Sequence, residues 1–244
     1  MADPWDEYLS VWGGKPVLRA IYEDFYDRIA AQCTSGMTIE IGGGIGNLKR
    51  WLPGVVSTDI QFVPWLDCVA DAQHLPFADG SAANIVMVDV LHHVEFPIRF
   101  FREAERLLQP GGRIVMVEPA ITWGSTLFYR LLHQEPVRMS ADPLVEGTRN
   151  PARDPYKSNQ AIPTLIVIKH RERFLRLFPN FKISCVEWIS LLAYPLSGGF
   201  KRWNLIPAGW SSPLLKVERA LEPALGRWMA FRLILVITKQ SCRT

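Results

Sequence analysis

A glycine-rich loop directly after a short apolar run constrains the fold of this chain more than any other feature. Residues 37–42 form a β-branched run that contains one acid, Glu40, and glycine recurs at Gly42, Gly44 and Gly46. This pattern predicts a buried strand that turns tightly into a helix. Glycine allows the backbone to approach a bound ligand where a Cβ atom would collide. In doubly wound α/β sheets, such a loop follows the first strand and opens the cofactor crevice.

Strand-like and helical patterns alternate over most of the chain. The predicted strands cover residues 37–42, 55–60, 68–70, 83–90, 112–118, 181–189 and 231–239. The predicted helices cover residues 17–32, 47–52, 97–108, 122–133, 169–178 and 213–228. Residues 134–163 are polar and rich in proline, so we expect an irregular segment there. The alternation predicts an α/β fold with a parallel sheet and helices on both faces.

The composition is that of an ordinary globular domain. The chain has 244 residues, of which 48% are hydrophobic and 21% charged, and we expect a single domain over residues 1–244. The net charge of +3 is small and the basic residues are scattered, which argues against nucleic-acid binding. The four cysteines lack metal-ligand spacing, so we expect no metal and free thiols. With no secretory-signal pattern and no apolar run of spanning length, we expect a cytoplasmic protein.

The spacing of the glycines separates two classes of cofactor. A dinucleotide fingerprint needs G-x-G-x-x-G, and counting from Gly42 its third glycine would fall on Asn47. An acid just before the loop instead suits a ligand with an amino group, such as S-adenosylmethionine. Asp59 ends the second strand, where it can accept hydrogen bonds from ribose hydroxyls, and Asp71 follows the third, where it can accept from an adenine amino group. Each acid alone is equally typical of an ordinary turn, but acids at three successive strand ends predict a cofactor site.

Five segments in this order resemble the class I S-adenosylmethionine-dependent methyltransferases of the type 11 branch. They are EIGGGIG at 40–46, Asp59, ADAQHLPF at 70–77, DVLHHV at 89–94 and LLQPGGR at 107–113. The resemblance covers about residues 37–119, the expected cofactor-binding core. It departs where Gly43-Gly44-Ile45 replaces the family's frequent Cys-Gly-Thr, although Gly44 is retained. It implies a doubly wound, Rossmann-like sheet of seven strands whose last strand is antiparallel, and 181–189 and 231–239 fit its last two strands.

The resemblance also implies which residues hold the cofactor. Glu40, Gly42, Gly44 and Gly46 would line the methionine end, Asp59 would hold the ribose, Asp71 and Ala72 would meet the adenine, and Asp89 would lie beside the sulfonium. Methyl transfer from a sulfonium needs no metal, and positioning of the acceptor alone can supply about 7–11 kcal/mol of the barrier. An oxygen acceptor also needs a general base, for which histidine is suited.

The candidate bases are His133 and His93, and both are also typical of structural histidines at a helix end or in a loop. Tyr129, Tyr156 and Asn159 are weaker candidates. Acceptor recognition is expected outside the resemblance, in an elaborated C-terminal region with substrate or lid insertions at 120–165 and 190–229. Within it, residues 191–213 interleave tryptophan and apolar residues with lysine and arginine. A hydrophobic acceptor pocket, a peripheral membrane contact, a lid and a dimer contact are alternatives for this segment.

The expected activity is S-adenosylmethionine-dependent methylation of a small-molecule, glycan or lipid-linked acceptor, on oxygen or alternatively on carbon. No nucleic-acid partner is expected, and the oligomeric state is not predicted. A second hypothesis is a non-catalytic protein that keeps the fold for cofactor sensing or partner binding. A third, a nicotinamide oxidoreductase, is disfavoured by the glycine spacing.

Overall fold

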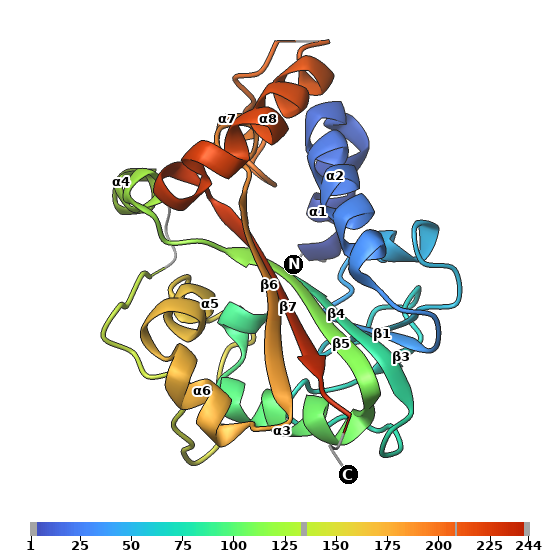
Figure 1. Ribbon diagram of the computed structural model, residues 1–244. Helices are drawn as coiled ribbons and strands as arrows, with labels where there is room; N and C mark the ends of the chain where they lie inside the picture. The colour runs from blue at the N-terminus through green and yellow to red at the C-terminus, as the bar shows by residue number, and fades with distance from the viewer. Residues whose placement is uncertain (1–3, 133–135, 208, 242–244) are drawn as a thin grey trace.

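The computed structural model describes residues 4–132, 136–207 and 209–241, which form a seven-stranded sheet with helices on both faces (Figure 1). The strands are β1 (Thr38–Ile41), β2 (Val56–Asp59), β3 (Cys68–Val69), β4 (Ala82–Val88), β5 (Leu108–Pro119), β6 (Phe181–Ile189) and β7 (Arg232–Lys239). Their order is β3-β2-β1-β4-β5-β7-β6. Strands β1 to β5 pair in parallel, whereas β7 lies antiparallel between β5 and β6. The predicted doubly wound sheet with an antiparallel last strand is confirmed.

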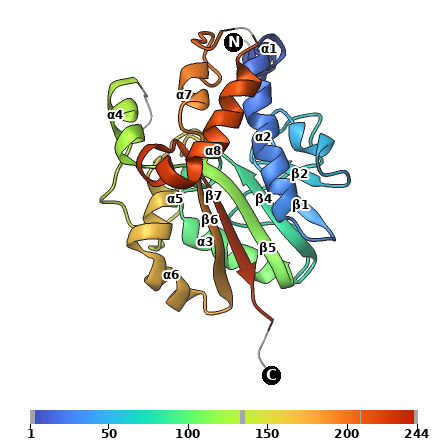
Figure 2. The same cartoon turned by 45° about the horizontal axis from the view of Figure 1, so that its top comes forward.

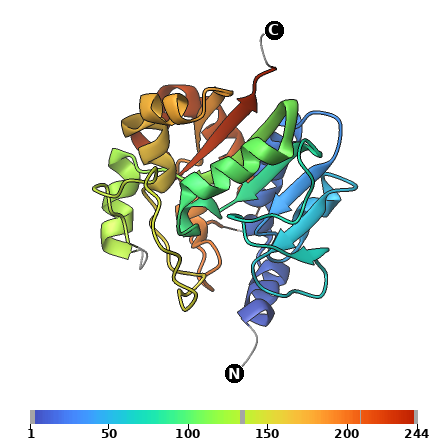
Figure 3. The ribbon, with the colours of Figure 1, turned by 90° about the horizontal axis from the view of Figure 1, so that it is seen from below.

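Helices form two layers, one on each face of the sheet. They are α1 (Pro4–Gly14), α2 (Pro16–Gln32), α3 (Pro97–Leu107), α4 (Trp123–Leu132), α5 (Ile162–Thr164), α6 (Arg171–Leu177), α7 (Ala193–Ser197) and α8 (Ser211–Met229), with short 3₁₀ turns at Asn47–Arg50 and Leu91–His93. Figure 2 shows α2 and α8 in front of one face, and Figure 3 shows α3 crossing the other. Proline begins α2 and α3, where its missing N–H group has no helical partner to lose.

The middle parts of the two central strands, residues 85–88 and 114–117, are apolar because both of their faces are covered. In the register of β4 and β5, Ile85 pairs with Ile114 and Val86 with Val115. Ile85 and Ile114 belong to the core that packs on α3 and α6, whereas Val86 and Val115 belong to the core that packs on α2. Successive residues of a strand point to opposite faces, so a strand covered on both sides is apolar at consecutive positions.

Two helical regions differ from the sequence-based expectation. Helix α1 precedes the first predicted helix, and the Gly13-Gly14 pair with Pro16 separates it from α2. The irregular segment ends before residue 162, because α5 continues into a π-helical turn at Leu165–Lys169. Leu165 and Ile166 of this turn are fully buried, so residues 162–165 are part of the core rather than of an insertion. No helix in the described ranges is both long and apolar enough to cross a membrane.

Candidate functional site

The glycine loop follows β1 at the edge of the sheet where the parallel strands end. Gly42, Gly44 and Gly46 have φ angles of +70°, +49° and +73°, which disfavour any residue with a Cβ atom. A Cβ atom on Gly42 would lie 2.3 Å from Cγ2 of Val90, and one on Gly46 would lie 2.9 Å from Cδ1 of Trp65. At Gly44 the nearest atom would be 3.4 Å away. Packing therefore requires glycine at the first and third positions, and backbone conformation requires it at all three.

Asp59 ends β2 directly beside this loop. Its Oδ2 atom accepts a 3.2 Å hydrogen bond from the amide of Gly44, and its Oδ1 atom accepts one of 3.0 Å from the amide of Gln61. The amide of Gly43 donates to the carbonyl oxygen of Thr58 at 2.8 Å. The end of β2 thus fixes the conformation of the loop that follows β1.

Glu40 is a buried acid of β1 beneath the loop. Its Oε2 atom accepts a 2.5 Å hydrogen bond from Oγ of Ser57, and it would lie 3.0 Å from a Cβ atom on Gly43. Burial raises the pKa of Glu40 to about 7, although the hydrogen bond from Ser57 opposes this shift. The carboxyl group therefore changes charge near neutral pH, and a cationic ligand group would favour its ionised form.

Asp71 follows β3 at the same edge, and Ala72 beside it is buried. The Oδ1 atom of Asp71 accepts a 2.9 Å hydrogen bond from the amide of Gln73, and its Oδ2 atom lies 2.6 Å from Nη2 of Arg149. Oδ2 of Asp71 is a buried acceptor that receives no aligned hydrogen bond, so the contact with Arg149 is an ion pair. Arg149 belongs to residues 136–161, which the sequence analysis assigned to an insertion.

Residues 136–161 lie against the loops at this edge through several polar contacts. The Tyr156 hydroxyl lies 3.5 Å from Oε1 of Gln61, which follows β2. The amide of Asn159 donates a 2.9 Å hydrogen bond to the carbonyl oxygen of His92. Together with the ion pair to Asp71, these contacts place the segment beside the ends of β2, β3 and β4.

Asp89 follows β4 and belongs to a buried polar cluster that the sequence analysis missed. Its backbone is left-handed, with φ of +57°, and its Oδ1 atom lies 3.0 Å from Nε of Arg232 in an ion pair. The Tyr22 hydroxyl donates a 3.1 Å hydrogen bond to Oδ2 of Asp89. Arg232 also donates to the Tyr129 hydroxyl at 3.1 Å, and its guanidinium lies 4.0 Å from the centre of the Tyr194 ring.

Burial makes ionisation of Tyr22 and Tyr129, two tyrosines of this cluster, less favourable than that of a free tyrosine. Burial raises the pKa of Tyr129 to about 12, and it also holds the pKa of Tyr22 well above its ordinary value. Tyr129 donates to the carbonyl oxygen of Phe231 at 3.2 Å. It is therefore a hydrogen-bond donor rather than the weaker base candidate of the sequence analysis.

The histidines after β4 have different surroundings. Nδ1 of His92 lies 2.7 Å from Oε2 of Glu118, and both side chains are buried. Oε1 of Glu118 accepts hydrogen bonds of 2.8 and 2.7 Å from the amides of Val90 and Leu91, so this carboxylate anchors the loop after β4. Nδ1 of His93 lies 3.1 Å from the carbonyl oxygen of Tyr156. The other base candidate, His133, lies outside the described residues.

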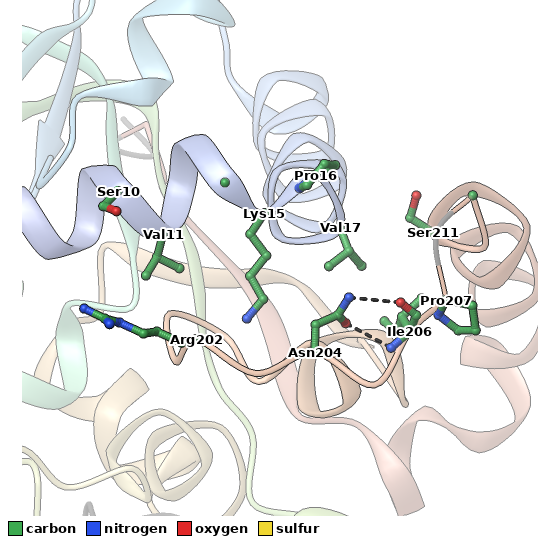
Figure 4. A pocket seen from close by; sticks show the side chains of 12 residues that line it. Ser10, Val11, Lys15, Pro16, Val17, Arg202, Asn204, Ile206, Pro207 and Ser211 are labelled. Carbon is green, nitrogen blue, oxygen red and sulfur yellow. Dashed lines mark hydrogen bonds between the residues drawn. The ribbon is translucent and has the colours of Figure 1, made fainter.

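A cavity of about 560 Å³ lies between α1, α2 and the loop before α8 (Figure 4). Lys15 borders it and donates hydrogen bonds of 2.7, 2.7 and 2.9 Å to the carbonyl oxygens of Gly199, Lys201 and Trp203. These bonds attach residues 199–203 to the junction of α1 and α2. The predicted cofactor residues do not line this cavity, so it is separate from the edge described above.

Residues 39–116 match the model of a methyltransferase domain, the same region that carries the glycine loop and Asp59. The chain carries a class I, type 11 methyltransferase domain. The cofactor of this domain is S-adenosylmethionine. The methyltransferase GfsG of Streptomyces halstedii is 38% identical over 50 residues, which are 20% of this chain and 18% of the relative. An uncharacterized 37.1 kDa protein in a transposon of Streptomyces fradiae is 36% identical over 106 residues, 41% of this chain and 30% of the relative.

The matched part of the chain thus spans less than a third of the length of either curated relative. Solved structures with similar folds cover it almost completely. A candidate sarcosine dimethylglycine methyltransferase from Galdieria sulphuraria has a TM-score of 0.55 and 16% identity, over 98% of this chain and 99% of that one. An S-adenosylmethionine-dependent methyltransferase from Thermotoga maritima has a TM-score of 0.54 and 15% identity, over 92% of both chains. Identities this low support the fold alone.

Proposed function

We propose that this protein is an S-adenosylmethionine-dependent methyltransferase whose cofactor lies along the edge formed by the ends of β1, β2, β3 and β4. The observation that carries the proposal is the link between the Gly44 amide and Asp59, which joins the glycine loop to the acid expected at the ribose. In this assignment, Glu40, Gly42, Gly44 and Gly46 line the methionine end, Asp59 holds the ribose, Asp71 and Ala72 meet the adenine, and Asp89 lies beside the sulfonium.

Two features of this edge fit the proposed cofactor. Gly42 and Gly46 keep the loop backbone close to Val90 and Trp65, where added side chains would collide. Asp71 and Asp89 lie at the same edge, where each pairs with an arginine, Arg149 or Arg232, and keeps further acceptor capacity on its carboxylate. The amino and hydroxyl groups of a ligand are suitable donors to these carboxylates.

The chain's own residues would position the reactants and exclude water. S-adenosylmethionine supplies a methyl group that its sulfonium has already activated. Glu40, when ionised, would hold the ligand's ammonium group, and Asp59 would orient the ribose. Asp89 is itself held by Arg232 and Tyr22, so its position beside the reacting centre is fixed before the acceptor arrives.

The acceptor is proposed to be a small molecule, a glycan or a lipid-linked glycan, methylated on oxygen. The buried tyrosines around Arg232 support an acceptor with hydroxyl groups, because phenols and a guanidinium can hydrogen-bond to them. His93 and His133 stay as base candidates. A neutral His93 that donates from Nδ1 to the Tyr156 carbonyl carries its lone pair on Nε2, as a general base requires.

Cofactor binding and turnover can be measured separately to test this proposal. Calorimetry with S-adenosylhomocysteine should show one binding site, weakened in Asp59→Ala. Release of S-adenosylhomocysteine from S-adenosylmethionine should then require an acceptor from a panel of phenols, sugars and lipid-linked sugars. Cofactor binding without turnover on any acceptor class would favour a non-catalytic protein, and turnover only with protein or RNA would contradict the proposed acceptor.

A further inference from the structure

Helix α8 has an unusually small buried side for a helix of 19 residues. Its buried residues are Glu218 and Gly226. A Cβ atom on Gly226 would lie 2.4 Å from the carbonyl oxygen of Trp188 in β6, so the helix backbone rests directly on the sheet there. Glu218 accepts hydrogen bonds from the amides of Leu192 and Ala193 at the start of α7. These contacts fix α8 in place and leave most of its circumference in solvent.

The exposed side of α8 carries a stripe of apolar residues that runs from Trp210, the residue just before the helix, to Trp228. Trp210, Val217, Leu221 and Trp228 follow one another at intervals of seven, four and seven residues, so they share one side of the helix. The tryptophans are 62% and 61% exposed. At 1.5 Å per residue, the stripe is about 27 Å long. Apolar side chains that are scattered singly need no explanation, whereas a continuous exposed stripe indicates an interaction surface.

Helix α4 extends this stripe beyond the C-terminal end of α8. Trp123 is 81% exposed, and Leu127, four residues later on the same side of α4, is also exposed. A Cβ atom on Gly124 would lie 3.1 Å from Cα of Met229, so α4 begins against the last turn of α8. Figures 1 and 2 both show the two helices side by side at this end. We call the exposed residues Trp123, Leu127, Trp210, Val217, Leu221 and Trp228 the α4–α8 surface.

The charged residues of α8 indicate which kind of partner this surface would bind. Both acids of the helix are engaged within the protein, Glu218 at the start of α7 and Glu222 in a 2.8 Å ion pair with Arg28. Of the basic side chains, Arg219 is paired with Asp24 of α2, whereas Lys216 and Arg227 are exposed. A helix with tryptophan and leucine on one side and basic residues beside them suits the interface of an anionic bilayer. In a two-fold dimer through this surface, the same basic side chains would meet, which disfavours a second copy of the chain as partner.

We propose that the α4–α8 surface binds to the surface of an anionic phospholipid membrane without crossing it. Tryptophan is favoured at the level of the lipid headgroups, and Lys216 and Arg227 would contact acidic headgroups beside it. The same helix α4 carries Tyr129, which accepts a hydrogen bond from Arg232 in the buried cluster beside Asp89. Membrane binding would therefore bring the reacting edge close to the bilayer. As a consequence that rests on the proposed function, a lipid-linked acceptor is favoured over a free small molecule.

Vesicle sedimentation tests the proposal with the full chain. We expect sedimentation with vesicles of phosphatidylcholine and phosphatidylglycerol at 7:3 and little with phosphatidylcholine alone. Trp123→Ser with Trp228→Ser should lower the partition coefficient at least tenfold. Lys216→Glu with Arg227→Glu should remove the preference for anionic vesicles. Each lost basic residue should lower the partition coefficient into these vesicles by about fivefold or more. Phe62→Ala removes an equally exposed aromatic side chain outside the surface and should bind vesicles like the parent protein.

Each alternative gives a different result. Equal binding of all variants, or no binding of the parent protein to anionic vesicles, would overturn the proposal. A change of oligomeric state in the tryptophan variant, with vesicle binding unchanged, would assign the surface to a dimer instead. If the tryptophan variant fails to fold, as judged by thermal unfolding, the charge variant alone tests whether the α4–α8 surface binds the membrane. Calorimetry with S-adenosylhomocysteine on the same samples keeps the two proposals separate, because loss of vesicle binding should leave cofactor binding intact.

Discussion

The amide of Gly44 donates a 3.2 Å hydrogen bond to Oδ2 of Asp59, which connects the loop after β1 to the end of β2. The two residues lie 15 positions apart in the sequence, and parallel pairing of β1 with β2 brings them together. One carboxylate thus holds the loop and faces the proposed ribose position. This dual role makes Asp59 the most informative single position in the proposed cofactor site.

Asp59→Ala should weaken binding of S-adenosylhomocysteine by about 1–3 kcal/mol, the range for lost hydrogen bonds to a charged group. The loss combines the missing ribose contacts with a less ordered glycine loop. Calorimetry at pH 7.5 measures it directly. Asp79→Ala is a matched control, because Asp79 is a surface acid that pairs with Arg106 at 2.7 Å away from this edge. Equal losses in both variants would contradict the assignment of Asp59.

Alanine substitutions at three glycines should separate backbone strain from collision. Gly54 has φ of +83° and open space around it, so Gly54→Ala should cost about 1–2 kcal/mol of unfolding free energy and leave binding unchanged. Gly42→Ala should cost more and abolish binding, because the new Cβ atom would lie 2.3 Å from Val90. At Gly44 the protein leaves room for a Cβ atom, so Gly44→Ala should lower the unfolding free energy only by the cost of backbone strain. Loss of cofactor binding in this variant would then indicate that the new Cβ atom collides with the cofactor. Chemical denaturation and calorimetry provide the two readouts.

Glu40 should make both stability and cofactor binding depend on pH. Burial raises its pKa from 4.5 to about 7 in the folded chain. Between these values the folded chain keeps a proton that the unfolded chain has released, so the contribution of Glu40 to stability falls as pH rises through this window. Glu40→Gln should remove that slope from the unfolding free energy.

The affinity for S-adenosylhomocysteine should change in the opposite direction. An ammonium group binds the ionised carboxylate, so binding should strengthen from pH 6 to pH 8, by up to about tenfold per unit below the pKa. Calorimetry across this range should show a weaker and flatter dependence in Glu40→Gln. The same slope in both proteins would mean that Glu40 does not hold the ligand's amino group.

Arg232→Met should destabilise the fold by about 3–5 kcal/mol, because it leaves the charge of Asp89 without its buried partner. Asp89→Asn combined with Arg232→Met should recover part of this loss. Arg176→Met is the surface comparison, because its 3.8 Å pair with Glu172 is exposed and should change stability by less than about 1 kcal/mol. Urea denaturation measures all three, and additive losses in the double variant would show that Asp89 and Arg232 are not coupled.

The sequence was sufficient to predict β1 to β5 and the sheet edge, because these depend on local patterns. The glycine loop, the apolar runs of β4 and β5 and the acids at strand ends are each readable within a few residues. The parallel order then follows from the fold class, which brings Glu40, Asp59 and Asp71 to one edge. The resemblance supplied the antiparallel last strand, which hydropathy alone does not specify.

The remaining parts of the site depend on contacts between distant segments. Arg232 reaches Asp89 because β7 is antiparallel and begins beside Pro119, the last residue of β5. Arg149 reaches Asp71 from a proline-rich segment with no periodic pattern. Glu118 looks like an ordinary strand-end acid until its hydrogen bonds to the loop after β4 are known. The arginine at the start of the last predicted strand, Arg232, was visible in the sequence. Its role as the partner of Asp89 can be inferred only once the strand order is known.

Calorimetric titration of the purified chain with S-adenosylmethionine tests the central claim most directly. The account predicts one site with a dissociation constant between the micromolar and millimolar ranges, weakened by both Asp59→Ala and Glu40→Gln, and no binding of NADH. Absence of binding up to millimolar S-adenosylmethionine, or tighter binding of NADH at the same edge, would contradict it.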